Sequence, residues 1–348
     1  MASAPAQALT RQLSSDRLNP APPDDVLFGK TAAMDEIRLR ARKACKTNIP
    51  ILLCGEGGTG KEALARWIHA NSNYSAGAFV KVNCAAIPGE LLESELFGYE
   101  KGTFTGANHT KPGLAELADH GTLFLDEIGE LNMHLQSKVL HFLQDGRFSR
   151  IGGQSETVVD TRLICATNRD LEVEIARGNF RTDLFYRINV VRFRMPSLRE
   201  RRADIPALAE FFREHHERQF GKPTVPFPSG MLDYLQNLDW PGNVRELSNG
   251  IARFVLIGTE AAIKQDHLQR RNASATEAGA VPLKNLAKSA IKDLERNVIL
   301  EALRAHQWNR RRTAQSLKIS YRSLIYKIRD AGLVSRKSAS PSESRPSN

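Results

Sequence analysis

The stretch that most constrains the fold of this chain runs from residue 49 to residue 62 and reads IPILLCGEGGTGKE. An uncharged apolar run leads into a glycine-rich turn, then Lys61, then apolar residues at helical spacing, which predicts a strand, a phosphate-binding loop and a helix. Its glycines let backbone N–H groups converge, while the helix N-terminus and Lys61 add positive charge, so the loop suits the β- and γ-phosphates of a nucleotide. The residues predicted to bind the nucleotide are Gly55, Glu56, Gly57, Gly58, Thr59, Gly60, Lys61 and Glu62.

One position of this loop is unusual. In the common pattern the lysine is followed by Ser or Thr, whose hydroxyl contacts Mg²⁺, whereas this chain has Glu62. The motif alone is therefore incomplete, and a glycine-rich turn with an incidental lysine is the alternative.

Polar side chains follow the ends of other predicted strands. Apolar runs at 78–84, 121–128, 161–168 and 189–195 alternate with helical patterns, which indicates an α/β fold with a parallel five-stranded sheet covered on both faces. Open α/β sheets bind ligands at the carboxyl edge. There Asp126 is predicted to hold Mg²⁺ and Glu127 to activate water for attack on the γ-phosphate. Asn83 and Asn168 end neighbouring strands and could contact the γ-phosphate or the water, although each could be an ordinary turn asparagine.

Three arginines are candidates for sensing or stabilising the phosphates. Arg181 and Arg187 lie in GNFRTDLFYRINVV, and in a ring-forming ATPase they could reach a neighbour's nucleotide as arginine fingers. Arg245 falls in the first turn of a helix predicted from WPGNVREL, with Asn243 as its cap and Glu246 completing a capping box. Surface ion pairs and a helix-surface arginine are the alternatives.

Length and composition set the wider frame. With 348 residues, 41% of them hydrophobic, the chain is long enough for two or three domains. We find no stretch typical of a membrane span or a signal peptide and therefore expect a cytoplasmic protein. The four cysteines are scattered, which predicts reduced core residues rather than disulfides or zinc ligands. The predicted segments are a disordered N-terminus at 1–26, an α/β core at 27–195, a helical lid at 196–264, a linker at 265–282, a helix-turn-helix domain at 283–334 and a disordered tail at 335–348.

The net charge of +10 is concentrated near the C-terminus, where residues 283–334 hold twelve Lys or Arg against four Asp or Glu. Helices at 309–317 and 321–331 joined by a short turn read as a DNA-binding helix-turn-helix. Tyr321, Leu324, Ile325 and Ile328 share one face and are expected to be buried. Phosphate contacts are predicted for Arg310, Arg311 and Arg312, and major-groove contacts for Arg322, Ser323, Tyr326, Lys327 and Arg329. A hairpin used only for dimerisation is the alternative.

A flexible loop exposes an aromatic residue in a polar setting, within ESELFGYEKGTFTGA. With LFLDE, FRTDLFYR, LRER and WPGNVREL, this GTFTGA stretch resembles the bacterial enhancer-binding proteins, AAA+ activators of sigma-54 RNA polymerase. The resemblance extends from about residue 27 to the C-terminus, where it includes a Fis-type helix-turn-helix.

The resemblance implies a role for each matching residue. It implies ATP and Mg²⁺ as ligands and Glu62 as the family's own residue in the phosphate loop. It also implies Asp126 as the Mg²⁺ ligand, Glu127 as the catalytic base with Asn83 as its switching partner, Asn168 as sensor I, Arg181 and Arg187 as arginine fingers, and Arg245 as sensor II. The loop that grips the sigma factor would comprise Gly102, Thr103, Phe104, Thr105, Gly106 and Ala107. Here Thr103 replaces the usual alanine of GAFTGA, which puts loop mobility or coupling in question.

These features together predict a DNA-tethered ATPase. Subunits would bind upstream enhancer DNA, assemble from dimers into a hexameric ring, and convert closed complexes of sigma-54 RNA polymerase holoenzyme into open ones. Because residues 1–26 leave no room for a receiver or sensor domain, control by a regulatory protein in trans or by expression level is expected. The alternatives are an AAA+ DNA-remodelling motor and a nucleotide-sensing DNA-binding regulator, neither dependent on sigma-54.

Overall fold

The computed structural model describes residues 22–223 and 226–259, together with residues 303, 306, 309–316, 321 and 324 near the C-terminus. Contacts divide the chain into two units, residues 1–264 and 265–348, and each is described by itself. Within the described ranges, no helix combines the length and apolar character needed to cross a bilayer. The linker and tail predicted at 265–282 and 335–348 lie outside the described residues, as does most of the N-terminal segment.

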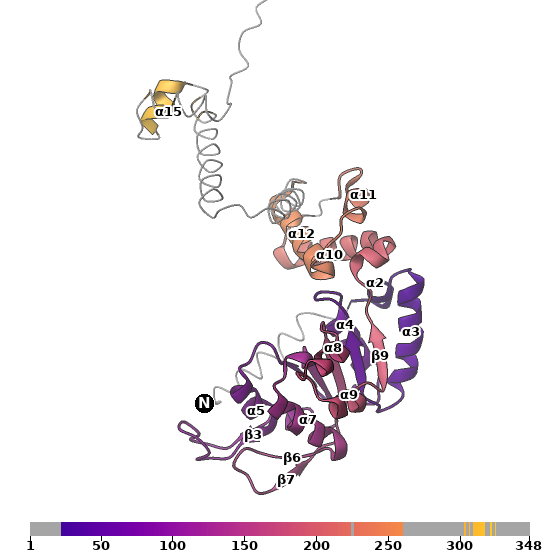
Figure 1. The fold of residues 1–348 in the computed structure, drawn as a ribbon. Helices are drawn as coiled ribbons and strands as arrows, with labels where there is room; N and C mark the ends of the chain where they lie inside the picture. Colours follow the sequence, from indigo (N-terminus) through magenta and orange to yellow (C-terminus); the bar gives the residue numbers. More distant parts are fainter. Residues whose placement is uncertain are drawn as a thin grey trace, which may run out of the picture. The chain divides into compact units, whose positions relative to one another are not determined.

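The centre of the first unit is a sheet of five parallel strands (Figure 1). Each strand overlaps one of the predicted apolar runs, so the predicted parallel five-stranded sheet is confirmed. In spatial order the strands are β2 (Phe79–Asn83), β5 (Thr122–Asp126), β8 (Arg162–Thr167), β1 (Ile51–Cys54) and β9 (Val191–Arg194).

Helices bury both faces of this sheet. Successive strand side chains point to opposite sides, and apolar ones on each side must be covered. Ile51 and Leu53 belong to one core cluster, whereas Leu52 and Cys54 belong to the other. The first face is covered by α2 (Asp24–Phe28), α3 (Ala32–Cys45) and α4 (Lys61–Ala70). The second is covered by α5 (Gly89–Phe97), α6 (Leu114–Leu117), α7 (Met133–Asp145), α8 (Leu171–Ala176) and α9 (Thr182–Ile188). All four cysteines are free and buried, which confirms that they are core residues.

Two short hairpins project from the core at the end away from the lid (Figure 1). The first pairs β3 (Gly98–Tyr99) with β4 (Lys111–Pro112), and the second pairs β6 (Arg147–Ser149) with β7 (Glu156–Val158). A bridge between Tyr99 and Ile151 joins them. The first hairpin carries the GTFTGA stretch at its tip.

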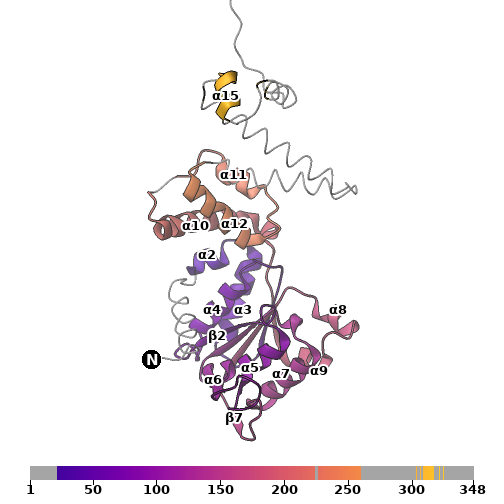
Figure 2. The same cartoon turned by 90° about the vertical axis from the view of Figure 1, so that its left-hand side faces the viewer.

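The lid is a separate helical layer with its own core (Figure 2). It contains the 3₁₀ segment η2 (Leu198–Asp204) and the helices α10 (Ile205–Phe220), α11 (Met231–Gln236) and α12 (Asn243–Ile257). Trp240 and Phe254 are almost completely buried in this layer. The predicted helical lid is therefore confirmed.

Two local predictions differ from the structure. Residues 24–26, expected to be disordered, begin α2, and the Asp24 carboxylate accepts a hydrogen bond of 2.6 Å from Trp67 Nε1. Asn243 is not the cap of α12: Gly242 is, and its N–H donates to Glu246 Oε2 at 2.8 Å. The pattern misleads because asparagine also tolerates positive φ, and Asn243 has φ 52°.

In the second unit, the described helix is α15 (Arg310–Ser316), inside the helix predicted at 309–317. Arg310, Arg311 and Arg312 are exposed on it, while Thr313 and Ala314 are buried. Leu324 is buried as predicted. Tyr321 is 49% exposed, contrary to prediction, because its polar hydroxyl makes helical spacing a weak guide to burial.

Candidate nucleotide-binding site

The phosphate loop connects β1 to α4 and depends on glycine where the lid approaches it. Gly58 has φ 77°, and a Cβ placed there would lie 2.4 Å from the Gly242 carbonyl oxygen. Gly60, with φ 101°, turns the chain into α4, so that Lys61 is the first helical residue. The loop therefore presents its backbone at a helix N-terminus, the arrangement that binds phosphate.

Lys61 lies inside this loop and is only 6% exposed. Its Nζ donates hydrogen bonds to the carbonyl oxygens of Gly55 at 2.8 Å and Glu56 at 3.3 Å, and lies 3.7 Å from Glu127 Oε1. Burial lowers the pKa of the Lys61 ammonium, while the carboxylates of Glu127 and Asp126 oppose that shift. The hydrogen bonds thus hold the Lys61 ammonium inside the loop, where the phosphates of a nucleotide would lie.

Asp126 and Glu127 stand at the carboxyl end of β5, as predicted. Glu127 has φ 55° and ψ 50°, a left-handed conformation that costs a non-glycine residue about 1–3 kcal/mol and is typical of functional sites. Its Oε2 accepts a hydrogen bond of 2.9 Å from the backbone N–H of Asn168. The neighbouring strand end therefore fixes this carboxylate beside Lys61.

Asn83 reaches the same edge by a different contact. It pairs with Asp126 in the register of β2 and β5, but its Oδ1 accepts from the N–H of Ala85 at 3.1 Å. In the described residues no hydrogen bond joins Asn83 to Glu127. Asn168 contacts Glu127 through its backbone N–H, while its side chain is exposed.

Lys81, which sequence reasoning missed, links two carboxylates of the site. Its Nζ lies 3.4 Å from Asp126 Oδ2 and forms an ion pair with Glu62 Oε2. Glu62 also accepts from Arg66, at 2.9 Å. Carboxylate oxygens are the ligands that Mg²⁺ prefers, and Asp126 supplies one at the carboxyl end of β5, so its side chain fits that metal. A lysine inside an otherwise apolar strand is the signal that could have revealed this position.

The lid binds the phosphate loop through Asn243, which the sequence pattern predicted as a helix cap. Its Nδ2 donates to the Gly57 carbonyl at 3.1 Å and to Glu56 Oε2 at 3.0 Å, and its Oδ1 accepts from Leu198 N–H at 2.7 Å. The side chain is completely buried. Asn243 therefore holds the start of α12 against the loop.

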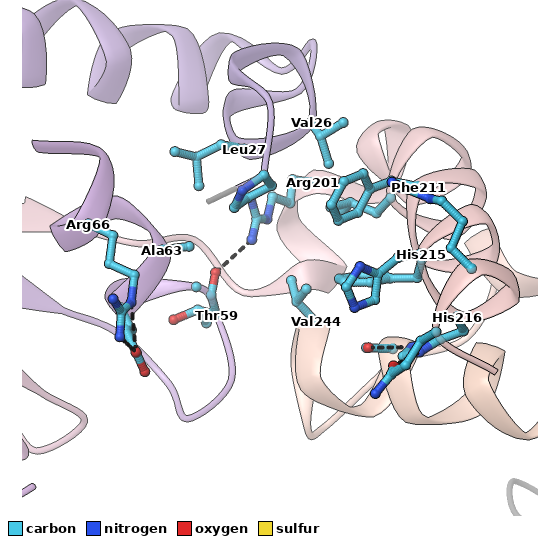
Figure 3. A pocket seen from close by; sticks show the side chains of 18 residues that line it. Val26, Leu27, Thr59, Ala63, Arg66, Arg201, Phe211, His215, His216 and Val244 are labelled. Carbon is cyan, nitrogen blue, oxygen red and sulfur yellow. Dashed lines mark hydrogen bonds and ion pairs between the residues drawn. The ribbon is translucent and has the colours of Figure 1, made fainter. Parts of the chain in front are cut away.

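Arginines of η2 strengthen this contact. Arg199 forms an ion pair with Glu56, which together with the Asn243 hydrogen bond lowers the pKa of the Glu56 carboxyl. Arg201 is buried and donates through Nη2 to the Thr59 carbonyl at 2.7 Å (Figure 3). Both come from the LRER motif, whose role was not evident from the residues alone.

Arg245 lies next to the loop, since its backbone N–H is 3.3 Å from the Gly58 carbonyl oxygen. Its side chain is exposed. Burial has the largest effect on the pKa of the Lys61 ammonium, which it lowers, and Glu127 and Asp126 oppose that shift. The positive charge of Arg245 lowers this pKa further. The lid thus brings this predicted sensor to the site.

Arg181 and Arg187 are not brought to the phosphate loop of their own chain. Arg181, the N-cap of α9, forms a two-pronged pair with Asp183, at 2.9 and 2.6 Å. Arg187 donates to the last carbonyls of α7, at 2.8 Å to Leu143 and 3.2 Å to Gln144. Both lie on the face of the core that α7 and α9 share.

A cavity of about 1020 Å³ adjoins the phosphate loop between the core and the lid. Apolar side chains of Leu27, Ala63, Phe211 and Val244 surround it, with His215 at its lid side (Figure 3). Such a mostly apolar cleft beside a phosphate loop can hold a planar base.

The GTFTGA loop lies at the tip of the first hairpin. Gly102 N–H donates to the Ala107 carbonyl at 2.9 Å and closes it. Phe104 is 47% exposed, with its ring 4.9 Å from that of Tyr99, and Thr105 is exposed. The loop presents both side chains to solvent.

Comparison with known proteins identifies the family. Residues 27–194 match the sigma-54 interaction domain, residues 199–285 the AAA+ ATPase lid domain, and residues 290–330 the Fis family of bacterial regulatory proteins. Over 313 residues the chain is 44% identical to the regulatory protein AtoC of Escherichia coli, covering 88% of this chain and 68% of AtoC. The chain belongs to the sigma-54-dependent transcriptional activators.

Two further similarities support this assignment. The chain is 40% identical to the response regulator protein PilR of Pseudomonas aeruginosa, covering 94% of this chain and 74% of PilR. A crystal structure of NtrX from Brucella abortus in complex with ATP is 33% identical, with a TM-score of 0.63, over 94% of this chain and 73% of NtrX. The activator is thus an AAA+ ATPase with a Fis-type helix-turn-helix, and alternatives independent of sigma-54 are not favoured. Of the predicted DNA-contacting residues, Arg322, Ser323, Tyr326, Lys327 and Arg329 lie outside the described residues.

Proposed function

We propose that this activator hydrolyses ATP between neighbouring subunits and uses the resulting change to move loop 102–107 against sigma-54, so that closed promoter complexes become open. The observation that carries the proposal is the convergence of three side chains at one sheet edge. Lys61 lies 3.7 Å from Glu127, and Asp126 precedes that glutamate at the end of β5. This is the constellation that phosphoryl transfer to water requires.

The phosphates of ATP would lie in loop 55–62, with Lys61 moving from the loop carbonyls to the β- and γ-phosphates. The base would enter the apolar cavity beside Leu27 and Phe211. The crystal structure of the related NtrX was determined in complex with ATP, which supports ATP as the ligand.

Asp126 would hold Mg²⁺, since its carboxylate ends β5 at the sheet edge where the phosphates would lie. When bound, the metal would neutralise charge on the phosphates. Glu127 would accept a proton from the attacking water, since Asn168 N–H holds its second oxygen and leaves the first directed toward Lys61. Asn83, in register with Asp126, would exchange its contact with Ala85 for Glu127 in another nucleotide state.

The positions of Arg181 and Arg187 favour a ring of subunits. Arg181 and Arg187 lie on a face that does not reach their own phosphate loop, so they would complete the site of a neighbouring subunit. We propose a homo-oligomer that proceeds from dimer to hexamer, with Arg245 of the lid reporting the nucleotide state within each chain.

The remaining partners follow from the other surfaces. Phe104 and Thr105 would contact sigma-54 in the RNA polymerase holoenzyme. Arg310, Arg311 and Arg312, all exposed on α15, would bind enhancer DNA phosphates. Because DNA and RNA polymerase are cytoplasmic in bacteria, we place the activator in the cytoplasm.

The decisive experiment compares Glu127→Gln and Thr105→Ala in ATPase and open-complex assays with sigma-54 holoenzyme. Glu127→Gln should bind ATP but lose at least about a hundredfold in turnover, as expected when a general base is removed. Thr105→Ala should hydrolyse ATP and fail to open promoters. A Thr105→Ala protein that opens promoters normally refutes the loop assignment, and normal turnover in Glu127→Gln refutes the base.

A further inference from the structure

We infer that Thr103 is a positioning residue that fastens the sigma-contact loop (102–107) to the turn of the second hairpin (150–153). The inference rests on the proposed role of loop 102–107 and adds a device that this chain has through its threonine. The alanine usual at this position in the family could form neither hydrogen bond of the hydroxyl.

The Thr103 hydroxyl bridges the two hairpins. Its Oγ1 lies 2.5 Å from the carbonyl oxygen of Glu100, within the first hairpin, and 3.1 Å from that of Ile151, in the second. A hydroxyl has one proton, so it donates to these two carbonyls in a shared hydrogen bond. The contact with Ile151 spans 48 positions of the sequence.

This bridge extends a short backbone ladder. Glu100 N–H donates to the Ile151 carbonyl at 3.0 Å, and Ile151 N–H donates to the Gly98 carbonyl at 3.0 Å. The Ile151 carbonyl thus accepts from both a backbone and a side-chain donor of the first hairpin. Thr103 carries the connection from the hairpin base into the loop itself.

Gly152 makes room for the threonine. A Cβ at Gly152 would lie 2.6 Å from Thr103 Oγ1 and 3.0 Å from its methyl carbon, and Gly152 has φ 73°. The side chain at position 103 therefore packs directly on the glycine backbone of the second turn. Gly152, which has no side chain, thus leaves space for the Thr103 hydroxyl to reach the Ile151 carbonyl.

The other contacts of the loop lie within the first hairpin, from Gly102 N–H to the Ala107 carbonyl at 2.9 Å and between the rings of Phe104 and Tyr99. A Cβ added at Gly102 or Gly106 would meet no atom within 4 Å, and Phe104 is 47% exposed. Thr103 directly precedes Phe104, so its contact with Ile151 ties the backbone beside that aromatic ring to the second hairpin. The two turns are expected to move together as long as the hydroxyl bridge is intact.

The test measures backbone hydrogen exchange in the full chain, in peptides covering 98–107 and 149–154. Thr103→Val keeps the side-chain shape and removes the hydroxyl, whereas Thr103→Ser keeps the hydroxyl. The matched control is Thr110→Val, which removes a hydroxyl of the same hairpin whose partners are Glu100 Oε2 and Lys101 N–H. We expect about fivefold faster exchange in both peptides for Thr103→Val, corresponding to about 1 kcal/mol. Thr103→Ser should exchange as the wild type does, and Thr110→Val should leave peptide 149–154 unchanged.

The same variants are then tested for capture of sigma-54 in the presence of an ATP transition-state analogue. Capture by Thr103→Val should fall or rise at least threefold, with Thr103→Ser at the wild-type value. Unchanged exchange in Thr103→Val, equal effects of Thr103→Val and Thr110→Val on peptide 149–154, or altered exchange with unaltered capture would each overturn the inference. Thr105→Ala separates this failure from that of the proposed function, because normal capture in Thr105→Ala refutes the loop assignment itself.

Discussion

Replacement of Asn243 by alanine should loosen the lid from the phosphate loop. The side chain is completely buried and accepts from Leu198 N–H at 2.7 Å, while its amide donates to Gly57 at 3.1 Å. Its φ of 52° is a second constraint, because asparagine adopts that conformation more readily than alanine. Asn243→Ala therefore removes hydrogen bonds and adds backbone strain at once.

The magnitude can be divided between these two causes. An unpaired buried N–H at Leu198 costs about 1–3 kcal/mol. Alanine in the left-handed region adds about 1–2 kcal/mol. The expected loss for Asn243→Ala is thus about 2–5 kcal/mol in the free energy of opening of α12. Asn243→Gly removes the same hydrogen bonds without the strain, so its loss should be about 1–3 kcal/mol.

Native-state hydrogen exchange measures this quantity, with the amides of α12 as reporters and those of β8 as the internal reference. A loss of about 2 kcal/mol accelerates exchange about thirtyfold. ATP affinity should fall in both variants, because Asn243 holds the loop that binds the phosphates. Equal exchange in the alanine and glycine variants would refute the strain argument, and wild-type exchange in both would refute the hydrogen-bond argument.

Two further predictions concern Asp204, in η2, and His69, in α4. Asp204 is 1% exposed and accepts from Lys30 N–H at 2.7 Å and from Thr31 Oγ1 at 3.0 Å; Asp204→Ala should lower the free energy of unfolding in urea by about 2–4 kcal/mol, and Asp204→Asn, which keeps one acceptor, by clearly less. Equal losses would contradict this reading. Burial lowers the pKa of His69 below 6.5, so the unfolded chain takes up this proton first and stability should fall as pH drops below about 6.5. His69→Gln should flatten that part of the stability profile, and an unchanged slope would exclude His69 as its source.

The sheet and its ligand edge could be predicted because both follow from local patterns. The strand β1 is short and apolar, and it ends at glycines, so the chain must turn there and expose backbone N–H groups. Asp126 follows an apolar strand of the same kind. The carboxyl ends of parallel strands lie at the same edge of a sheet. The phosphate loop and Asp126 could therefore be placed together without regard to the number of residues between them.

Contacts that close the site could not be predicted, because they join residues with no shared local pattern. Arg201 and Thr59 are 142 positions apart, and Asn243 and Gly57 are 186 positions apart. An asparagine before a helix reads as a cap, and only the tertiary fold shows that its amide is needed elsewhere. Lys81 was missed for a related reason, since a charge inside a strand has no local partner and acquires its role only when β2 lies beside β5.

These long-range contacts have one target, the backbone of the phosphate loop. Arg201 binds the Thr59 carbonyl, Asn243 the Gly57 carbonyl, and Arg245 N–H approaches the Gly58 carbonyl at 3.3 Å. The lid binds the carbonyl oxygens of Thr59 and Gly57, whereas those of Gly55 and Glu56 accept from Lys61. A shift of the loop backbone when the γ-phosphate leaves must therefore change three lid contacts together. The lid is therefore positioned to respond to hydrolysis through the loop backbone, in addition to any contact of Phe211 with the base.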